Sequence, residues 1–246
     1  MAVIHRTTMS PGKLELLTGW LPSRPWYQGS EGAVPQLAKA GGFRLDDPEG
    51  EVGIEFMVVT DGSGDAPVAY LVPVTYRGAP LKGAEEGLIG TSEHGVLGRR
   101  WIYDGAHDPV LVEQLLALLA GRTTAQDQNA SDAPDPTVEV RTDAADATDG
   151  ADGGDGADGG GAPDAMGGVP VGITGSGRVA ETAGATVVAV GRASGEGPDL
   201  ELTVSRVLRP GHAAGDAVRG QVLAGWSAPD GTGERGVFAF LSGACQ

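Results

Sequence analysis

The fold of this chain is decided by two segments, PVAYLVPVTYRGAPL (residues 67–81) and EHGVLGRRWIYDGAHDPVLVEQLLALLAG (residues 93–121). The first holds Val68–Tyr76, an apolar run rich in β-branched and aromatic residues, which is typical of a strand. The second holds Asp108-Pro109, where Asp suits the N-cap of a helix and Pro its first helical position. Leucines follow at helical spacing, and Gly121 is a residue type that commonly ends a helix. The two segments therefore predict a strand and, further along, a helix.

The residues before these segments predict more strands. Val52–Thr60 and Phe43–Leu45 are apolar runs with a period of two, as strands have. Asp- and Gly-rich turns at residues 46–50 and 61–65 connect these runs, so that each neighbouring pair forms a hairpin. Ala2–Met9, in which β-branched residues dominate, predicts a further strand. We expect an antiparallel meander of at least three strands.

Helices are expected to cover one face of this sheet, because an antiparallel sheet must bury at least one face. Ser10-Pro11 predicts a helix start that is followed by leucines at helical spacing, and the helix must end before Pro22. Val34–Ala40 is a candidate for a second short helix, and residues 109–120 for the third. Gly90–Asp104 is buriable but has no clear period. The fold class is therefore α+β, a meander sheet with flanking helices.

A change of composition marks a linker. Aspartate recurs at every third position from Asp143 to Asp158, in a segment with almost no apolar residue. Such a segment cannot bury enough surface to offset the loss of backbone entropy. We therefore expect an acidic, disordered linker over residues 122–167, with TVEVR at residues 137–141 as a candidate strand.

Strand-like sequence returns after the linker. The apolar or alternating runs are Thr186–Val190, Leu200–Leu208, Val218–Trp226 and Gly236–Leu241. A turn at Pro229–Gly231 joins the last two into a hairpin. The sequence thus predicts three parts, residues 1–121, 122–167 and 168–246. The last is either a small β-rich module of its own or a set of extra strands on the first sheet.

The composition argues against several classes of function. The net charge is −16, and ten acidic residues with a single Arg fall between Ser131 and Asp164. Nucleic acids and anionic membranes attract basic surfaces, so we expect neither as a partner. Cys245 is the only cysteine, which rules out an intramolecular disulfide. With no apolar signal-peptide core and no run long enough to span a membrane, we expect a cytoplasmic protein.

Three short motifs resemble parts of catalytic sites, and each has a simpler interpretation. Gly175–Ala180 fits G-x-G-x-x-A, but the Val- and Thr-rich sequence after it favours a Gly-rich hairpin turn over the helix that a dinucleotide site needs. His107-Asp108 has the wrong spacing for a kinase catalytic loop, and its Asp suits an N-cap. Ser92 lacks the G-x-S-x-G context of a nucleophile and is interpreted as a turn hydroxyl.

The distribution of histidines and lysines argues against enzymatic activity. The four histidines do not cluster at metal-ligand spacing; they are His5, His94, His107 and His212. The three lysines stand outside any phosphate-binding loop; they are Lys13, Lys39 and Lys82. We therefore expect no catalytic residue, no metal site and no cofactor, and lean against enzymatic activity.

A set of aromatic and basic side chains is the best candidate for a binding surface. Trp and Tyr residues at positions 20, 26, 27, 101 and 103 suit either the stacking of a sugar or an anchoring role in the core. Basic residues beside Trp101 stand out in an acidic protein. The candidate surface comprises Trp26, Tyr27, Arg77, Arg99, Arg100 and Trp101.

Three further segments carry a family resemblance. WLPSRPWYQG (residues 20–29), YLVPVTYRGAPL (residues 70–81) and HGVLGRRWIYDGAHDP (residues 94–109) resemble the N-terminal cap domain of actinobacterial maltokinases and related glucosamine kinases. The resemblance covers about the first half of the chain and implies an α+β domain with a curved antiparallel sheet and flanking helices. In that family the cap precedes kinase lobes, and no position of this chain matches their catalytic residues.

The resemblance implies a non-catalytic, cap-like module that binds or regulates a partner, an enzyme of maltose, trehalose or glycogen metabolism. Two alternatives remain open. The first is a carbohydrate-binding protein that uses Trp26, Tyr27 and Trp101. The second is a kinase-like subunit that acts on a sugar with ATP.

Overall fold

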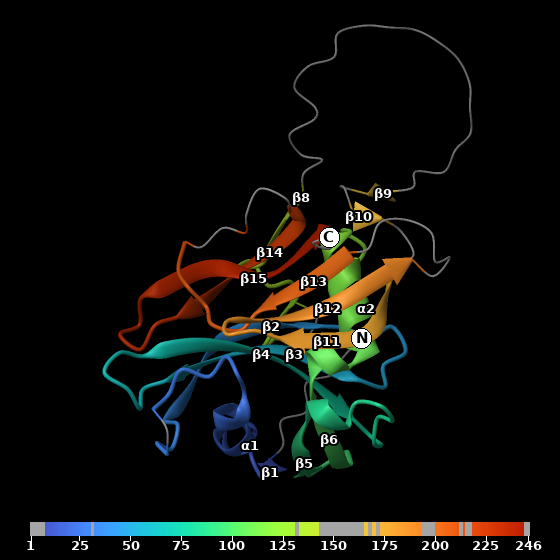
Figure 1. Ribbon diagram of the computed structural model, residues 1–246. Helices are drawn as coiled ribbons and strands as arrows, with labels where there is room; N and C mark the ends of the chain where they lie inside the picture. The colour runs from blue at the N-terminus through green and yellow to red at the C-terminus, as the bar shows by residue number, and fades with distance from the viewer. Residues whose placement is uncertain are drawn as a thin grey trace, which may run out of the picture.

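The computed structural model describes residues 8–30, 32–130, 133–142, 165–166, 169–170, 173–192, 200–211, 214 and 218–243. In Figure 1 the strands of residues 53–104 lie below those of residues 200–243, and helix α2 runs beside both. The N-terminal strands are β1 (Met9–Ser10), β2 (Leu37–Leu45), β3 (Gly53–Asp61), β4 (Val68–Arg77), β5 (Leu88–His94), β6 (Gly98–Asp104), β7 (Gln126–Asp127) and β8 (Glu139–Thr142). The C-terminal strands are β9 (Ala165–Met166), β10 (Val169–Pro170), β11 (Ile173–Glu181), β12 (Ala185–Arg192), β13 (Leu200–Ser205), β14 (Val218–Ser227) and β15 (Gly233–Gly243). The helices are α1 (Lys13–Trp20) and α2 (Pro109–Leu119), with short 3₁₀ turns η1 (Leu21–Ser23), η2 (Glu85–Gly87) and η3 (Gly105–His107).

The predicted meander is confirmed. Strands β2, β3 and β4 pair antiparallel in sequence order, with Phe43 opposite Phe56 and Phe56 opposite Pro73. The ambiguous segment that begins at Gly90 is part of a hairpin, in which β6 pairs with β5 on one side and with β4 on the other. The fold is mostly antiparallel sheet with two short helices, consistent with the α+β class.

Helix α2 begins and ends where its sequence predicts. The Asp108 side chain accepts a hydrogen bond from the Val110 backbone N–H at 3.0 Å. Pro109 is the first helical residue, Ala120 is the C-cap, and Gly121 has a positive φ of 67°. A left-handed residue just after the C-cap is the common way to end a helix, and glycine adopts it without a Cβ clash.

Near the N-terminus one predicted helix forms but starts later than expected, and a second predicted helix is wrong. Helix α1 starts at Lys13 with Gly12 as its N-cap, because Ser10 belongs to β1 and pairs with Glu93 of β5. The helix predicted at 34–40 does not form, since residues from Leu37 onward extend β2 along β3. Both errors have one cause: pairing with a distant strand overrides a weak local helix preference. The strand predicted from Ala2 lies, before residue 8, outside the described residues.

The N-terminal and C-terminal strands join at two places. Gly41 of β2 pairs with Trp226 of β14. The backbone after β13 also pairs with β4. The Leu71 N–H donates to the Arg206 carbonyl at 3.0 Å, and the Leu208 N–H donates to the Ala69 carbonyl at 2.9 Å. Strand β14 therefore continues the sheet beyond β2, and the segment after β13 bridges to β4, which lies inside the sheet between β3 and β6.

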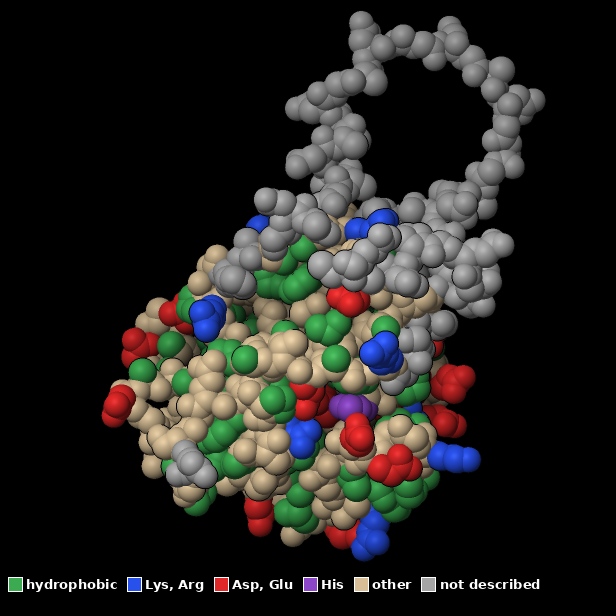
Figure 2. All heavy atoms as spheres, viewed as in Figure 1, with side chains coloured by type: hydrophobic (Ala, Val, Ile, Leu, Met, Phe, Trp, Pro, Cys, Tyr) green, Lys and Arg blue, Asp and Glu red, His purple; other side chains and the backbone are tan. Residues whose placement is uncertain are grey.

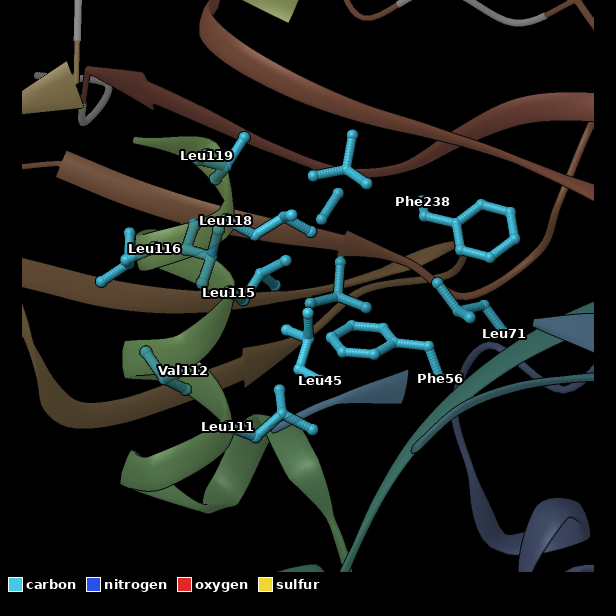
Figure 3. Packing of buried hydrophobic residues seen from close by; sticks show 14 of the residues in the cluster. Leu45, Phe56, Leu71, Leu111, Val112, Leu115, Leu116, Leu118, Leu119 and Phe238 are labelled. Atoms are coloured by element: carbon cyan, nitrogen blue, oxygen red, sulfur yellow. The ribbon is translucent and has the colours of Figure 1, made fainter. Parts of the chain in front are cut away.

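The main core lies between these two sets of strands, as Figure 3 shows. Phe43 stacks on Phe56 with 4.5 Å between ring centroids, and Phe238 of β15 stacks on Phe43 at 5.9 Å. The α2 side chains that join the same cluster are Leu111, Val112, Leu115, Leu116, Leu118 and Leu119. Neither the N-terminal nor the C-terminal half buries its apolar face alone.

A second, smaller core lies on the opposite face of β3 and β4, against α1 and the loop after it. Successive side chains of a strand point to opposite faces, so Met57 enters this core while Phe56 enters the main one. The helix and loop contribute Leu17, Trp20, Leu21 and Trp26. Strands β3 and β4 are thus buried on both faces.

The structured part of the chain extends beyond the predicted boundary near residue 121. Strand β7 pairs with β2, and β8 pairs with β14, which confirms the candidate strand in TVEVR. The Asp-repeat at 143–158 lies outside the described residues. Gly175–Ala180, predicted as a turn, is part of β11, and the turn falls after Glu181 instead.

Candidate functional site

A pocket of about 430 Å³ opens on the α1 side of β3 and β4. It lies where the N-terminus of α1, the middle of β2 and the β5–β6 hairpin come together. The side chains and backbone that line it are Met9, Lys13, Lys39, Arg44, Asp47, Gly50, Glu51, Val52, Gly53, Ile54, Glu55, Tyr76, His94, Leu97, Arg100 and Gln128. Its volume is in the range of small-molecule sites.

Glu55 is the buried charge of this pocket, with 5 % of its surface exposed. Its neighbours Ile54 and Phe56 both point into the main core, so strand alternation turns Glu55 toward α1. The Tyr76 hydroxyl donates to Glu55 Oε2 at 2.7 Å, and Lys13 Nζ forms an ion pair with the same oxygen. A buried carboxylate needs such partners to remain charged.

Two more side chains complete the surroundings of Glu55. Lys39 Nζ lies 3.8 Å from Oε1, and Gln128 Nε2 donates to Oε1 at 3.5 Å. Burial by itself would raise the pKa of Glu55, but the Lys13 ammonium and the hydrogen bonds from Lys13 and Tyr76 lower that pKa below its ordinary value. Burial and the Glu55 charge raise the pKa of Tyr76 well above its ordinary value. The carboxylate is therefore ionised and the phenol neutral at physiological pH.

Three more charged groups of the pocket are hydrogen-bonded to the backbone. Arg44 Nε donates to the Asp127 carbonyl at 3.1 Å, and Arg100 Nη2 donates to the Leu97 carbonyl at 2.8 Å. The Asp47 carboxylate accepts hydrogen bonds from three backbone N–H groups of the turn that follows it. Asp47 is therefore satisfied within its own turn, whereas the two guanidinium charges face neutral carbonyl oxygens.

Sequence reasoning missed this cluster, although it left one signal. Glu55 is the only charged residue in the apolar run from Ile54 to Val59, and an unpaired charge is rarely buried. Its partners Lys13 and Lys39 are two of the three lysines in the chain. They were considered for a phosphate-binding loop, which the sequence lacks. Their convergence on one carboxylate depends on how α1 and β2 pack.

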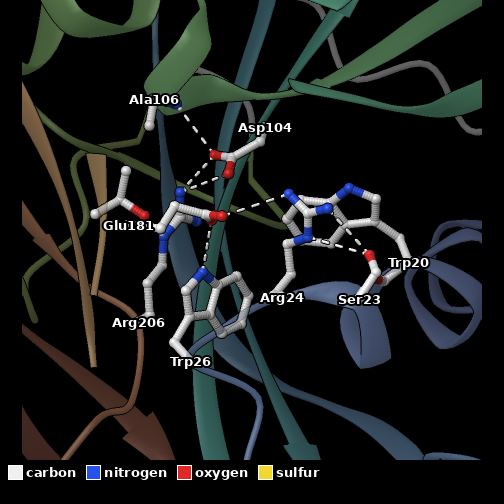
Figure 4. A network of polar contacts seen from close by, with 9 residues as sticks. Trp20, Ser23, Arg24, Trp26, Asp104, Ala106, Glu181 and Arg206 are labelled. Carbon is white, nitrogen blue, oxygen red and sulfur yellow. Dashed lines mark hydrogen bonds and ion pairs between the residues drawn. The ribbon is translucent and has the colours of Figure 1, made fainter. Parts of the chain in front are cut away.

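A buried polar network ties the two halves of the molecule together (Figure 4). Arg206 and Asp104 both have 0 % side-chain exposure, and Arg206 Nη2 donates to both Asp104 oxygens at 2.7 and 2.6 Å. The Arg206 guanidinium lies 5.1 Å from the centre of the Trp26 ring, and Trp26 Nε1 donates to Glu181 Oε1 at 2.9 Å. These contacts are enclosed, so we interpret the network as structural.

A known family matches the part of the chain that builds much of the pocket and the network. Residues 20–108 match the maltokinase N-terminal cap domain. This match confirms the resemblance, and we call these residues the cap segment. It begins at the last residue of α1 and ends at Asp108, the N-cap of α2. No curated protein matches the chain.

The cap segment supplies most of the pocket. Lys39, Glu55 and Tyr76 lie within it, as does Arg100. Lys13 lies before the cap segment, however, so the ion pair of Glu55 is formed with a residue outside the match. The cap segment also supplies Trp26 and Asp104 to the buried network, while Arg206 comes from the C-terminal half.

Strand alternation divides the predicted binding surface. Arg100 faces the pocket on the side of Ile102. Trp101 lies opposite Arg77 on the other face, where Arg77 Nε and Nη2 donate to the Asp108 carboxylate, both at 2.7 Å. Arg99 is exposed and pairs with Glu93 at 2.9 Å. These residues form no single surface.

The aromatic part of the predicted surface also differs from expectation. Trp26 is 0 % exposed and belongs to the second core, which removes it from any accessible surface. The Tyr27 hydroxyl donates to Asp61 Oδ2 at 2.8 Å. Burial, followed by the hydrogen bond to Asp61, raises the pKa of Tyr27 to about 12. Ser92, predicted as a turn hydroxyl, lies in β5 and donates to the Pro11 carbonyl at 2.8 Å.

The described residues show neither a metal cluster nor a membrane-spanning helix. No three His, Cys, Asp or Glu side chains among them are grouped so as to hold a metal ion. Neither described α-helix is long and apolar enough to cross a membrane.

Proposed function

We propose that this protein is a cap-like interaction module that performs no catalysis of its own and binds an enzyme of maltose, trehalose or glycogen metabolism. One observation carries the proposal. The cap segment matches a maltokinase domain, and the chain beyond it, through α2 and the C-terminal strands, packs onto the same core. The residues that follow the cap segment complete its fold. We infer that the protein works together with a separate enzyme.

The tip of the β5–β6 hairpin is the surface best suited to such a partner. Val96 is 63 % exposed and Leu97 46 % exposed, and Arg99 stands beside them. Apolar side chains next to a basic one are a common composition for a protein interface. Elsewhere, as on the face in Figure 2, acidic and basic side chains are interspersed.

Affinity capture from extract of the native cells tests the proposal. The wild-type chain is the bait, beside a Val96→Asp/Leu97→Asp variant and a Val34→Asp control, which changes another exposed apolar residue away from the hairpin. We expect wild type and control to retain one enzyme of α-glucan or trehalose metabolism at stoichiometric amounts, and the hairpin variant to lose it. Capture of no such enzyme by the wild type would sink the proposal.

The pocket supports a second candidate, a carbohydrate-binding protein. The buried Glu55, the Tyr76 hydroxyl and the Gln128 amide bring an acceptor, a phenol and an amide to one cavity of small-molecule size. This site replaces the aromatic surface expected from sequence. Titration with maltose, trehalose and glycogen, followed by calorimetry, tests it. A flat response at millimolar sugar would count against this candidate.

A further inference from the structure

We infer that the pocket binds its ligand through an anionic group, a phosphate or a carboxylate, that contacts Arg100 and Lys39. The inference rests on the pocket proposed above as a carbohydrate site and names the chemical class of its ligand. The partner proposed for the hairpin is a separate proposal, although Leu97 belongs to both surfaces.

The acidic side chains of the pocket are largely satisfied without a ligand. Glu55 is paired with Lys13 and hydrogen-bonded by Tyr76. Asp47 is buried, and backbone N–H groups occupy its carboxylate. Glu51 is the remaining acid of the lining and is exposed to solvent. The pocket therefore offers little free negative charge to attract a cation.

The basic side chains, in contrast, are incompletely neutralised. Among the described residues, Arg44 and Arg100 donate to backbone carbonyls and form no ion pair. Lys39 has only the long contact of 3.8 Å with Glu55, and its side chain is 43 % exposed. Asp127 is another acid near Arg44 and Lys39. Its pKa is lowered chiefly by hydrogen bonds from the backbone N–H groups of residues 129 and 130, and Arg44 and Lys39 lower it less.

Arg100 gives the strongest indication. Its Nε is buried, and no described group accepts its hydrogen. A buried donor without an acceptor is costly, so the protein itself satisfies this guanidinium only in part, through the Leu97 carbonyl, and its charge is available to a ligand. Guanidinium groups bind phosphate and carboxylate through paired hydrogen bonds, which are stronger than those to neutral oxygens. A charged ligand group is therefore favoured over a sugar hydroxyl at this end of the pocket.

Calorimetric titration of the full-length protein at low ionic strength tests the inference. The probes are glucose 1-phosphate, inorganic phosphate and glucose, which separate the anionic group from the sugar. We expect glucose 1-phosphate to bind at least tenfold more tightly than glucose, inorganic phosphate to compete with it, and added salt to weaken both anions, because screening weakens charge pairs.

Matched variants locate the site. Arg100→Gln and Lys39→Gln are each expected to weaken glucose 1-phosphate binding about tenfold, the loss typical of one charge-assisted hydrogen bond. Arg99→Gln, on the opposite face of the same strand, and Lys82→Gln, which is exposed, serve as controls and should bind as wild type does. Thermal unfolding of each variant confirms that it is folded.

Three results would overturn the inference. One is that neither anion binds, and another is that the two control variants weaken binding as much as the pocket variants do. The third is that glucose and glucose 1-phosphate bind equally well; this would leave the carbohydrate candidate standing and reject only the anionic contact. The hairpin capture experiment is unaffected by any of them.

Discussion

At the scale of single residues, the Arg206–Asp104 pair is the most consequential contact. Both side chains are enclosed, so removing one leaves the other charge buried without a partner. Arg206→Met should therefore lower the free energy of unfolding by about 3–5 kcal/mol, the usual cost of breaking a buried pair. Urea unfolding measures this. Arg99→Gln, which breaks an exposed pair, should change stability by less than about 1 kcal/mol, and equal losses in both variants would contradict the argument.

Glu55 gives a prediction for pH. Its pKa is lowered in the folded protein, so its charge stabilises the fold above the ordinary carboxyl pKa, and that stabilisation is lost as the pH falls through the lowered value. Glu55→Gln should cost about 1–3 kcal/mol near neutral pH, because Lys13 loses its counter-charge but stays partly exposed. The difference from wild type should shrink below about pH 4. Urea unfolding across this range checks it, and a difference independent of pH would refute the assignment.

At the scale of elements, Asp108 has two roles that substitution can separate. It caps α2 through Val110 and pairs with Arg77 through both carboxylate oxygens. Asp108→Asn keeps a good N-cap residue but loses the charge, whereas Asp108→Ala loses both. We expect the Ala variant to be less stable than the Asn variant by about 1 kcal/mol, the typical worth of a cap. Thermal and urea unfolding compare them; equal stability would mean that the cap contributes nothing.

Strand β2 depends on a glycine where it bends toward β14. Gly42 has a φ of 116°, and a Cβ there would lie 1.8 Å from the Phe56 carbonyl oxygen. Gly42→Ala should therefore displace β2 from β3 and destabilise the protein by more than about 2 kcal/mol, well beyond the ordinary cost of a strained residue. Gly50→Ala is the control, since that turn glycine has a positive φ but open space around it. Chemical unfolding of the two variants should show the smaller loss for Gly50→Ala.

At the scale of the whole molecule, the shared core predicts a single unfolding transition. Phe43 of the cap segment stacks on Phe56 and also on Phe238 from the end of the chain, so neither half retains its core without the other. Tryptophan fluorescence and far-ultraviolet circular dichroism should give coincident urea curves, the test of two-state unfolding. A fragment of residues 1–142 should remain unfolded alone and bind a dye for exposed apolar surface. Two separate transitions, or a folded fragment, would show independent halves.

Local sequence signals predicted the elements that depend on neighbours in the chain. Asp108-Pro109 and Gly121 gave the ends of α2, and the Asp/Gly turns gave the meander. They failed at Ser10 and at Leu37, where pairing with β5 and β3 determines the structure. The candidate site was harder still. Of the pocket side chains, only Arg100 is predicted from sequence as a binding residue, and strand alternation separates it from Arg99.

By itself, then, the sequence determined the α+β class, helix α2, the strands of the meander and the resemblance to a cap domain, because caps, turns and alternation act over a few residues. Only the tertiary structure decided that Trp26 is core, that the C-terminal strands close onto β2 and β4, and that two scarce lysines meet at Glu55. These facts depend on contacts between residues far apart in the chain, Lys13 and Glu55 being one example. Such contacts follow from the packing of whole sheets, which no short pattern encodes.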